Sequence, residues 1–315
     1  MTDFLKKIQK KELVLFWIAF TIAIVFYSIN IGLSDLWSDE TYTKSMLSGT
    51  LSDFYAKFKN DLHPPLYYLG LRMYTGIFGL STMSLRSFSV VGVLATLCLA
   101  YFVGQRIFGK RGALYLCLML ISIPMLAVYS HQARMYTWAT FSITGVFIYS
   151  YLFIKTGTTR DLVLLLIFTL AAIYTHYYSL IAAFIANVFV FFQLVLTKNR
   201  KWHNHLISLL IAFILFLPWL SMFIVQIKRV QGAFWAPEVS LTTIVSCFTI
   251  PFTEQFRTTP FSKSLTILMY SLIVLTIILS FKKSFSEYRL ALWLSLVIFI
   301  GTLIIAMIIS LFSQP

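Results

Sequence analysis

The sequence predicts an all-α polytopic membrane protein. Of its 315 residues, 59% are apolar and only 11% are charged, and the mean hydropathy is +0.84. A water-soluble domain is about 45–50% apolar and about 25% charged, so these values exclude a soluble enzyme. The 30 Phe and 17 Tyr exclude a disordered chain. The apolar runs are long and continuous, whereas a transmembrane barrel needs alternating segments of about ten residues.

The uncharged runs predict about nine transmembrane helices, because a spanning helix needs about 20 residues. The runs free of Lys, Arg, Asp and Glu are 13–34, 87–105, 112–133, 135–154, 162–197, 202–227, 264–281 and 290–315. The run 162–197 is long enough for two spans, and the polar turn 174–179 divides it. The run 13–34 exceeds the core of a signal peptide, which is about 7–15 residues, so we expect it to be retained as a first span near 13–33.

The apolar segment 64–83 is predicted not to span. Arg72 lies in its middle, and an arginine at the bilayer centre costs about 2.5–3.5 kcal/mol. Helical spacing places its apolar residues on one side, as in a helix that lies in the membrane interface. These residues are Leu66, Leu69, Met73, Ile77 and Leu80. We therefore expect interfacial helices in a first outer loop at 34–85.

The distribution of charge predicts the orientation. With nine spans and a cytoplasmic N-terminus, every inner loop carries Lys or Arg, and 15 of the 25 basic residues face inward. Seven of the 11 acidic residues face outward. The net charge of +14 therefore reflects topology, and we expect no nucleic-acid partner. The prediction is one membrane-embedded domain, 1–315, in the cell membrane, with long outer loops at 34–85 and 228–262.

Five clusters of polar and aromatic residues fall on the outer side. They contain Asp39 and Glu40, His63, Arg134 and Tyr136, His176, and the segment 234–238. Each cluster also has an ordinary structural explanation. The carboxylates could cap a helix N-terminus, His63 could lie in a rigid turn, and Arg134 could reach lipid phosphate. His176 could be a polar residue at a hairpin tip, and the segment 234–238 could belong to an aromatic belt at the membrane interface. Together they bring a carboxylate pair, two histidines and an arginine to one leaflet. That inventory suits group transfer from a lipid-linked phosphate.

Six motifs, taken in chain order, resemble the membrane-embedded GT-C glycosyltransferases. The closest group contains the protein O-mannosyltransferases and the lipid A aminoarabinose transferases, and the resemblance covers residues 35 to about 240. The motifs are Asp39-Glu40, His63-Pro64-Pro65-Leu66-Tyr67-Tyr68, Leu85-Arg86-Ser87, Gln132-Ala133-Arg134-Met135-Tyr136, Tyr174-Thr175-His176-Tyr177 and Phe234-Trp235-Ala236-Pro237.

The resemblance implies transfer of a sugar from a polyprenyl-phosphate donor, on the extracytoplasmic side, with inversion at the anomeric carbon. Asp39 would deprotonate the acceptor hydroxyl, with Glu40 in support. Arg134 and His63 would face the donor phosphate, although His63 stands where the aminoarabinose transferases carry lysine. Tyr136 and His176 would line the sugar or phosphate pocket. The acceptor would be a protein, a glycan or a glycolipid.

We expect no cofactor. Some GT-C enzymes use a divalent metal, but no outward cluster of His and Asp here has the spacing of metal ligands. The three cysteines, Cys98, Cys117 and Cys247, form no metal or disulfide spacing either.

Two other classes of function remain compatible with the sequence alone. A transporter or flippase of a lipid-linked sugar places broken helices near the midplane, and Pro124 and Pro218 could break helices. Against it, no charged residue lies in the middle of a predicted span. A non-catalytic subunit would carry the same hydropathy pattern.

The predicted orientation has a direct test. An epitope tag placed within 106–111 should be accessible only after the membrane is permeabilised, because this basic loop is predicted to be cytoplasmic. Labelling of intact cells at this tag would contradict the nine-span topology. A tag in the first outer loop, near residue 50, is the matched control and should be labelled on intact cells.

Overall fold

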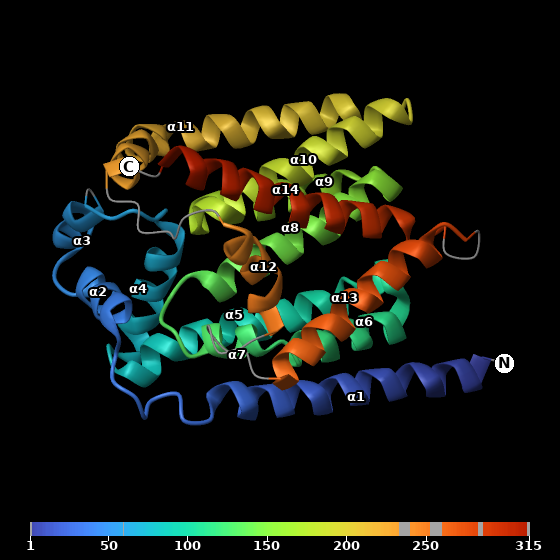
Figure 1. Ribbon diagram of the computed structural model, residues 1–315, viewed down its shortest axis with the longest axis horizontal. Coiled ribbons are helices and arrows are strands. Elements are labelled where there is room, and N and C mark those ends of the chain that lie inside the picture. Colours follow the sequence, from blue (N-terminus) through green and yellow to red (C-terminus); the bar gives the residue numbers. More distant parts are fainter. Residues whose placement is uncertain (1, 59, 233–239, 253–259, 283–285, 314–315) are drawn as a thin grey trace. The chain divides into compact units, whose positions relative to one another are not determined.

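The computed structural model describes residues 2–58, 60–232, 240–252, 260–282 and 286–313, and its regular structure within these ranges is entirely helical (Figure 1), which confirms the all-α class. The helices of the first half are α1 (Thr2–Ser28), α2 (Ser38–Leu47), α3 (Leu51–Phe58), α4 (Leu66–Phe78), α5 (Thr82–Phe102), α6 (Gln105–Ile121), α7 (Pro124–Ser130) and α8 (Tyr136–Thr156). Those of the second half are α9 (Thr159–Thr175), α10 (Tyr177–Leu196), α11 (Trp202–Gly232), α12 (Leu241–Thr249), the 3-10 helix η1 (Ile250–Phe252), α13 (Pro260–Ser280) and α14 (Arg289–Ser313).

The predicted spans each coincide with a helix, apart from 112–133. Six helices among the described residues are long and apolar enough to cross a membrane, namely α1, α5, α8, α10, α11 and α14, or seven if the bent pair α6–α7 forms one span. This confirms a polytopic membrane protein, while the count of nine stays a prediction. The first helix ends at Ser28, before the predicted end, because Asn30 adopts a left-handed turn with φ 59°.

The expected span 112–133 is not continuous. It is split into α6 and α7, whose axes differ by 66°. The cause is Pro124, which has no amide hydrogen and disfavours helical backbone at the residue before it. Ile123 accordingly has φ −75° and ψ 112°. The break lets the chain turn ahead of the segment 131–135, which carries Arg134.

Helix α4 is short, as the non-spanning prediction requires, while its position in the membrane interface stays a prediction. It has 13 residues, or about 20 Å at 1.5 Å per residue, too short to span. Met73 and Ile77, on the predicted apolar side, are exposed, whereas Tyr67, Tyr68 and Leu71 on the opposite side are buried. Arg72 donates to the carbonyl oxygens of Leu47 (2.7 Å) and Gly49 (3.0 Å), at the C-terminus of α2. Its charge thus stabilises the negative end of that helix.

The contacts divide the chain into two compact units. Unit 1 comprises residues 1–60 and 65–148, and unit 2 comprises 61–64 and 149–315. In unit 1, α5 packs against α1, α4, α6 and α7. Phe16 of α1 stacks on Tyr101 of α5 with ring centroids 4.1 Å apart. This apolar core also includes Ile31, in the segment that follows α1, and Leu126 of α7.

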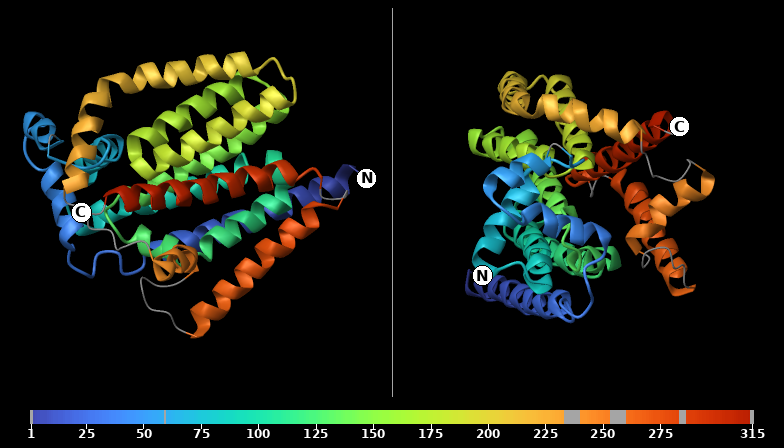
Figure 2. Two further views of the ribbon diagram at one scale, coloured as in Figure 1. Left: turned by 45° about the horizontal axis from the view of Figure 1, so that its top comes forward. Right: turned by 90° about the vertical axis from the view of Figure 1, so that its left-hand side faces the viewer.

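Unit 2 is organised around α10, which packs against α9, α11 and α14. Small residues allow this close approach: Ala183 and Ala186 of α10 are fully buried. A Cβ added to Gly301 of α14 would lie 3.1 Å from Ile185. Helix α11 contains Pro218 and changes direction along its length (Figure 2). The large apolar side chains left exposed on α11, α13 and α14 are those expected to face lipid.

Candidate functional site

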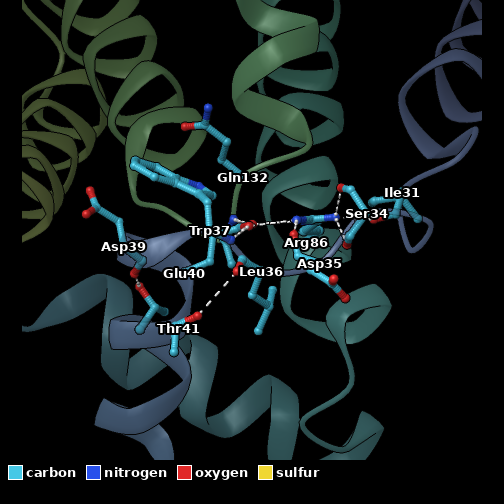
Figure 3. A network of polar contacts seen from close by, with 12 residues as sticks. Ile31, Ser34, Asp35, Leu36, Trp37, Asp39, Glu40, Thr41, Arg86 and Gln132 are labelled. Atoms are coloured by element: carbon cyan, nitrogen blue, oxygen red, sulfur yellow. Dashed lines mark hydrogen bonds and ion pairs between the residues drawn. The ribbon is translucent and has the colours of Figure 1, made fainter.

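The carboxylates of Asp39 and Glu40 lie in the first turn of α2. This helix begins at Ser38, directly after Trp37, whose backbone is extended (φ −77°, ψ 174°). Acidic residues are favoured in a first turn because they face the positive end of the helix dipole. Adjacent helical residues differ by about 100° in direction. Figure 3 shows the consequence: Glu40 points toward Arg86, and Asp39 points away from it.

Glu40 is a buried charged group of unit 1 with several hydrogen-bond partners. Its side chain is completely buried, and it accepts a bidentate pair of hydrogen bonds from Arg86, from Nε at 2.8 Å and from Nη2 at 2.7 Å. It also accepts the backbone N–H groups of Ala133 at 2.8 Å and Trp37 at 3.3 Å. A buried carboxylate needs such compensation for its lost hydration. The carboxylate therefore joins α2, α5 and the segment 131–135.

Arg86 completes this network from α5. Besides Glu40, its guanidinium donates to the carbonyl oxygens of Ile31 (3.0 Å), Ser34 (3.0 Å) and Asp35 (2.9 Å). It also donates to Ser34 Oγ at 2.9 Å. These bonds hold the chain between α1 and α2 (Figure 3). The sequence analysis includes Arg86 only as part of a motif and gives it no role. The feature that could have indicated its ion pair is a single charged residue near the start of an otherwise apolar helix.

Arg134 lies beside Asp39. Its Nη2 is 3.8 Å from Asp39 Oδ2, and its side chain is 4% exposed whereas that of Asp39 is 44% exposed. Nη1 also donates to Thr43 Oγ1 at 3.5 Å. Burial alone would lower the pKa of the Arg134 guanidinium, but the nearby Tyr68, Tyr136 and Asp39 side chains raise that pKa above its usual value. The arrangement is an accessible carboxylate backed by a buried, permanently charged cation.

The backbone around Arg134 is held on both sides. Ser89 of α5 donates to the carbonyl oxygens of Gln132 (2.6 Å) and Arg134 (3.3 Å). The ring of Tyr136, the first residue of α8, lies 4.5 Å from that of Tyr129. Tyr136 also interacts with Arg134. The interruption between α7 and α8 thus presents Arg134 and Tyr136 together.

The two predicted histidines lie in unit 2. His63 Nδ1 is 3.1 Å from the buried carboxylate of Asp61, and the rings of His63 and His176 are 6.2 Å apart. His176 has extended backbone (φ −159°) between α9 and α10 and caps α10 by accepting the N–H of Tyr178 at 3.2 Å. Asp61 lies two residues before His63 in the sequence and received no predicted role.

The structure therefore places the six predicted site residues in two groups. Asp39, Glu40, Arg134 and Tyr136 lie together in unit 1, and His63 and His176 lie together in unit 2. The predicted aromatic cluster at 234–238 lies outside the described residues. Within the described part of the chain, no group of three or more His, Cys, Asp or Glu is arranged to hold a metal ion. Independence from metal stays a prediction.

The buried ion pair leads to a stability prediction. Glu40→Gln should destabilise the protein by about 3–5 kcal/mol, because Arg86 would keep its buried charge without a counter-charge. Thermal unfolding of the purified protein in detergent measures the loss. Asp39→Asn, one residue away but accessible, is the matched control and should change the stability by less than about 0.5 kcal/mol. Equal stability of the two variants would contradict the anchoring role of Glu40.

Comparison with known proteins agrees with the resemblance seen in the sequence. The family described as dolichyl-phosphate-mannose-protein mannosyltransferase matches residues 62–222, just over half of the chain. The matched region includes Arg86, Arg134, Tyr136, His63 and His176, and it begins after Asp39 and Glu40. Among proteins of curated function, none matches the chain. With its apolar helices and this match, the chain belongs to the dolichyl-phosphate-mannose-protein mannosyltransferase family, whose members are membrane glycosyltransferases of the GT-C type that use a polyprenyl-phosphate sugar.

Proposed function

We propose that this protein transfers a sugar from a polyprenyl-phosphate donor to an acceptor hydroxyl, with inversion at the anomeric carbon and with Asp39 as the base. The observation that carries the proposal is the pairing of Asp39 with Arg134 in unit 1. An accessible carboxylate can remove a proton from an acceptor, and a neighbouring guanidinium can bind a phosphate. The family description names mannose, so polyprenyl-phosphate mannose is the first donor to test.

The proposed transfer is a single displacement at the anomeric carbon of the sugar. Asp39 takes the proton of the acceptor hydroxyl, and the acceptor oxygen forms a bond to the anomeric carbon of the sugar. The bond between that carbon and the phosphate oxygen breaks at the same time. The leaving polyprenyl phosphate keeps the electron pair and gains one negative charge. Attack on the face opposite to the leaving group inverts the anomeric configuration.

Arg134 is proposed to stabilise the charge that develops on the leaving phosphate. Guanidinium binds phosphate with paired, charge-assisted hydrogen bonds, and a preorganised cation acts most strongly where water is excluded. The near-complete burial of Arg134 suits this role. Glu40 is proposed as a positioning residue, because its carboxylate is already occupied by Arg86, Ala133 and Trp37.

The roles proposed for the residues of unit 2 are those that the family resemblance implies. His63 is proposed to contact the donor phosphate. His176 and, in unit 1, Tyr136 are each proposed to bind the sugar or the phosphate of the donor. The acceptor is a protein, as in the description of the family, or a glycan or glycolipid. The charge distribution supports a cell-membrane protein with a cytoplasmic N-terminus and transfer on the extracytoplasmic side. Family membership favours transfer over the alternative of a lipid-sugar transporter or flippase.

Replacement of the base tests the proposal. Asp39→Asn should lower turnover of polyprenyl-phosphate mannose by about 10²–10⁴-fold, the usual contribution of a general base, with no loss of folded protein. The measurement is release of polyprenyl phosphate by purified protein supplied with a membrane extract as acceptor source. Asp53→Asn makes the same change on α3 of the same outer loop and should keep wild-type turnover. A fully active Asp39→Asn variant would assign the base to another residue.

Replacement of Arg134 tests the donor site separately. Arg134→Ala should weaken donor binding by about 10–100-fold, as expected for lost hydrogen bonds to a charged group, and should affect the acceptor much less. Donor and acceptor dependences of the rate measure the two effects. Arg134→Lys keeps the charge but not the paired geometry, so its loss should be intermediate. Equal losses for donor and acceptor would indicate an arginine that only reaches lipid phosphate.

A further inference from the structure

An exposed tryptophan precedes the proposed base by two residues, and helix formation does not explain it. Trp37 is the N-cap of α2, a position where helices favour Ser, Thr, Asp or Asn because a side-chain oxygen can accept a free N–H group. The indole makes no such bond, and 43% of the residue is exposed. Among the described residues, the indole also has no hydrogen-bond partner and no aromatic ring in contact with it.

The rotation of α2 gives Asp39 a buried side and an exposed side. Adjacent residues differ by about 100°, so Thr43 lies about 40° to one side of Asp39 and Tyr42 about 60° to the other. Thr43 is completely buried and accepts the hydrogen bond from Arg134, whereas Tyr42 is 39% exposed. The buried cation and an exposed aromatic residue therefore flank the base on opposite sides.

Trp37 adds a second exposed ring next to Asp39. Figure 3 shows the indole and the Asp39 carboxylate on the same side of Glu40, both turned away from Arg86. The Glu40 carboxylate fixes the start of this segment, because it accepts the backbone N–H of Trp37 at 3.3 Å. The accessible surroundings of the base thus contain two aromatic residues, and all of these groups belong to unit 1.

The proposed displacement determines which substrate meets these rings. Inversion requires the acceptor oxygen and the leaving phosphate to lie on opposite faces of the anomeric carbon. Arg134 is proposed to bind the phosphate, so the acceptor approaches Asp39 from the side away from Arg134. That side carries Tyr42, with Trp37 nearby.

We propose that Trp37 and Tyr42 bind a sugar ring of the acceptor, which is therefore a carbohydrate, either a free glycan or the head group of a glycolipid; this inference rests on the proposed function. One face of a sugar ring presents mainly C–H groups, and these pack on the electron-rich face of an aromatic ring. The indole N–H donates to a sugar hydroxyl, and a phenolic hydroxyl both donates and accepts.

The remaining exposed surface of α2 also favours a carbohydrate over a peptide. Peptides commonly add to the edge of a sheet or lie in an apolar groove, whereas the accessible element beside Asp39 is a helix. Apart from Tyr42, the exposed residues of α2 are polar, and three of them carry hydroxyl groups. These residues are Ser38, Thr41, Lys44 and Ser45. Hydroxyl-rich ligands match such a surface because each hydroxyl can donate and accept.

The test measures how the rate of transfer depends on the acceptor. Purified protein in detergent receives polyprenyl-phosphate mannose and one of three acceptors: a soluble mannose oligosaccharide, a glycolipid with a mannose head group, or a peptide rich in Ser and Thr. Wild type should use a sugar acceptor with kcat/KM at least about tenfold above that for the peptide. Comparison of the two sugar acceptors distinguishes a free glycan from a glycolipid.

Replacement of the tryptophan tests the binding surface itself. Trp37→Leu should raise KM for the sugar acceptor about tenfold, because the flat ring is lost while an apolar side chain remains. The donor KM, and kcat at saturating acceptor, should stay within about twofold of wild type. Trp37→Phe keeps a ring and should retain most of the affinity. Tyr55→Leu removes another exposed ring from the same outer loop and is the matched control, with neither KM changed.

Three results would overturn the carbohydrate site and leave the proposed function standing. The first is preferential transfer to the peptide. The second is a Trp37→Leu variant with wild-type KM for the sugar acceptor. The third is an equal rise of the donor and acceptor KM values in this variant, as expected for an aromatic residue that only anchors the protein in the membrane interface.

Equilibrium binding of the oligosaccharide separates the two proposals if wild type transfers to no acceptor. Binding that Trp37→Leu weakens about tenfold supports the carbohydrate site and overturns the proposed transfer. Absence of binding overturns both. If Trp37→Leu does not fold, Tyr42→Leu removes the other ring and should raise the acceptor KM in the same way; an unchanged KM in that variant overturns the carbohydrate site.

Discussion

The buried ion pair between Glu40 and Arg86 is the interaction on which the organisation of unit 1 depends. Burial of two charges is costly, and their attraction offsets that cost only with good geometry and further hydrogen bonds. Both conditions hold: the pair is bidentate, Arg86 has four additional acceptor contacts, and Glu40 accepts two backbone N–H groups. The pair thereby connects three segments that are far apart in the chain.

This constraint separates the roles of two adjacent carboxylates. Because Glu40 turns inward to Arg86, the helical rotation turns Asp39 toward Arg134 and the surface. The same Glu40 carboxylate holds the backbone N–H of Ala133, the residue before Arg134. One buried group therefore positions both members of the Asp39–Arg134 pair. A carboxylate with this many partners is suited to holding a site and unsuited to removing a proton from a substrate.

Three polar side chains of the two units occur where an apolar helix is interrupted. Arg134 follows the break between α7 and α8, His176 separates α9 from α10, and Trp219 follows Pro218 in α11. Within a bilayer, irregular backbone is tolerated only where protein or a water-filled cavity satisfies its polar groups. Here hydrogen bonds from Ser89, from the N–H of Tyr178 and from Tyr174 serve that purpose. The same breaks in the helices therefore place these polar side chains and are themselves stabilised by hydrogen bonds.

The sequence by itself determined the all-α membrane class, the position of the apolar helices other than the broken segment 112–133, the short helix α4 around Arg72, and the resemblance to the family. Hydropathy and the cost of Arg72 in lipid act locally, and so they can be judged from neighbouring residues alone. Only the tertiary structure decided that Arg86 pairs with Glu40, that Asp39 and not Glu40 is accessible, and that Pro124 breaks a span. These properties depend on packing between residues that are distant in the chain: 46 positions separate Glu40 from Arg86, and 93 separate Glu40 from Ala133. Which of two adjacent carboxylates faces inward is settled by the partner that packing brings to it.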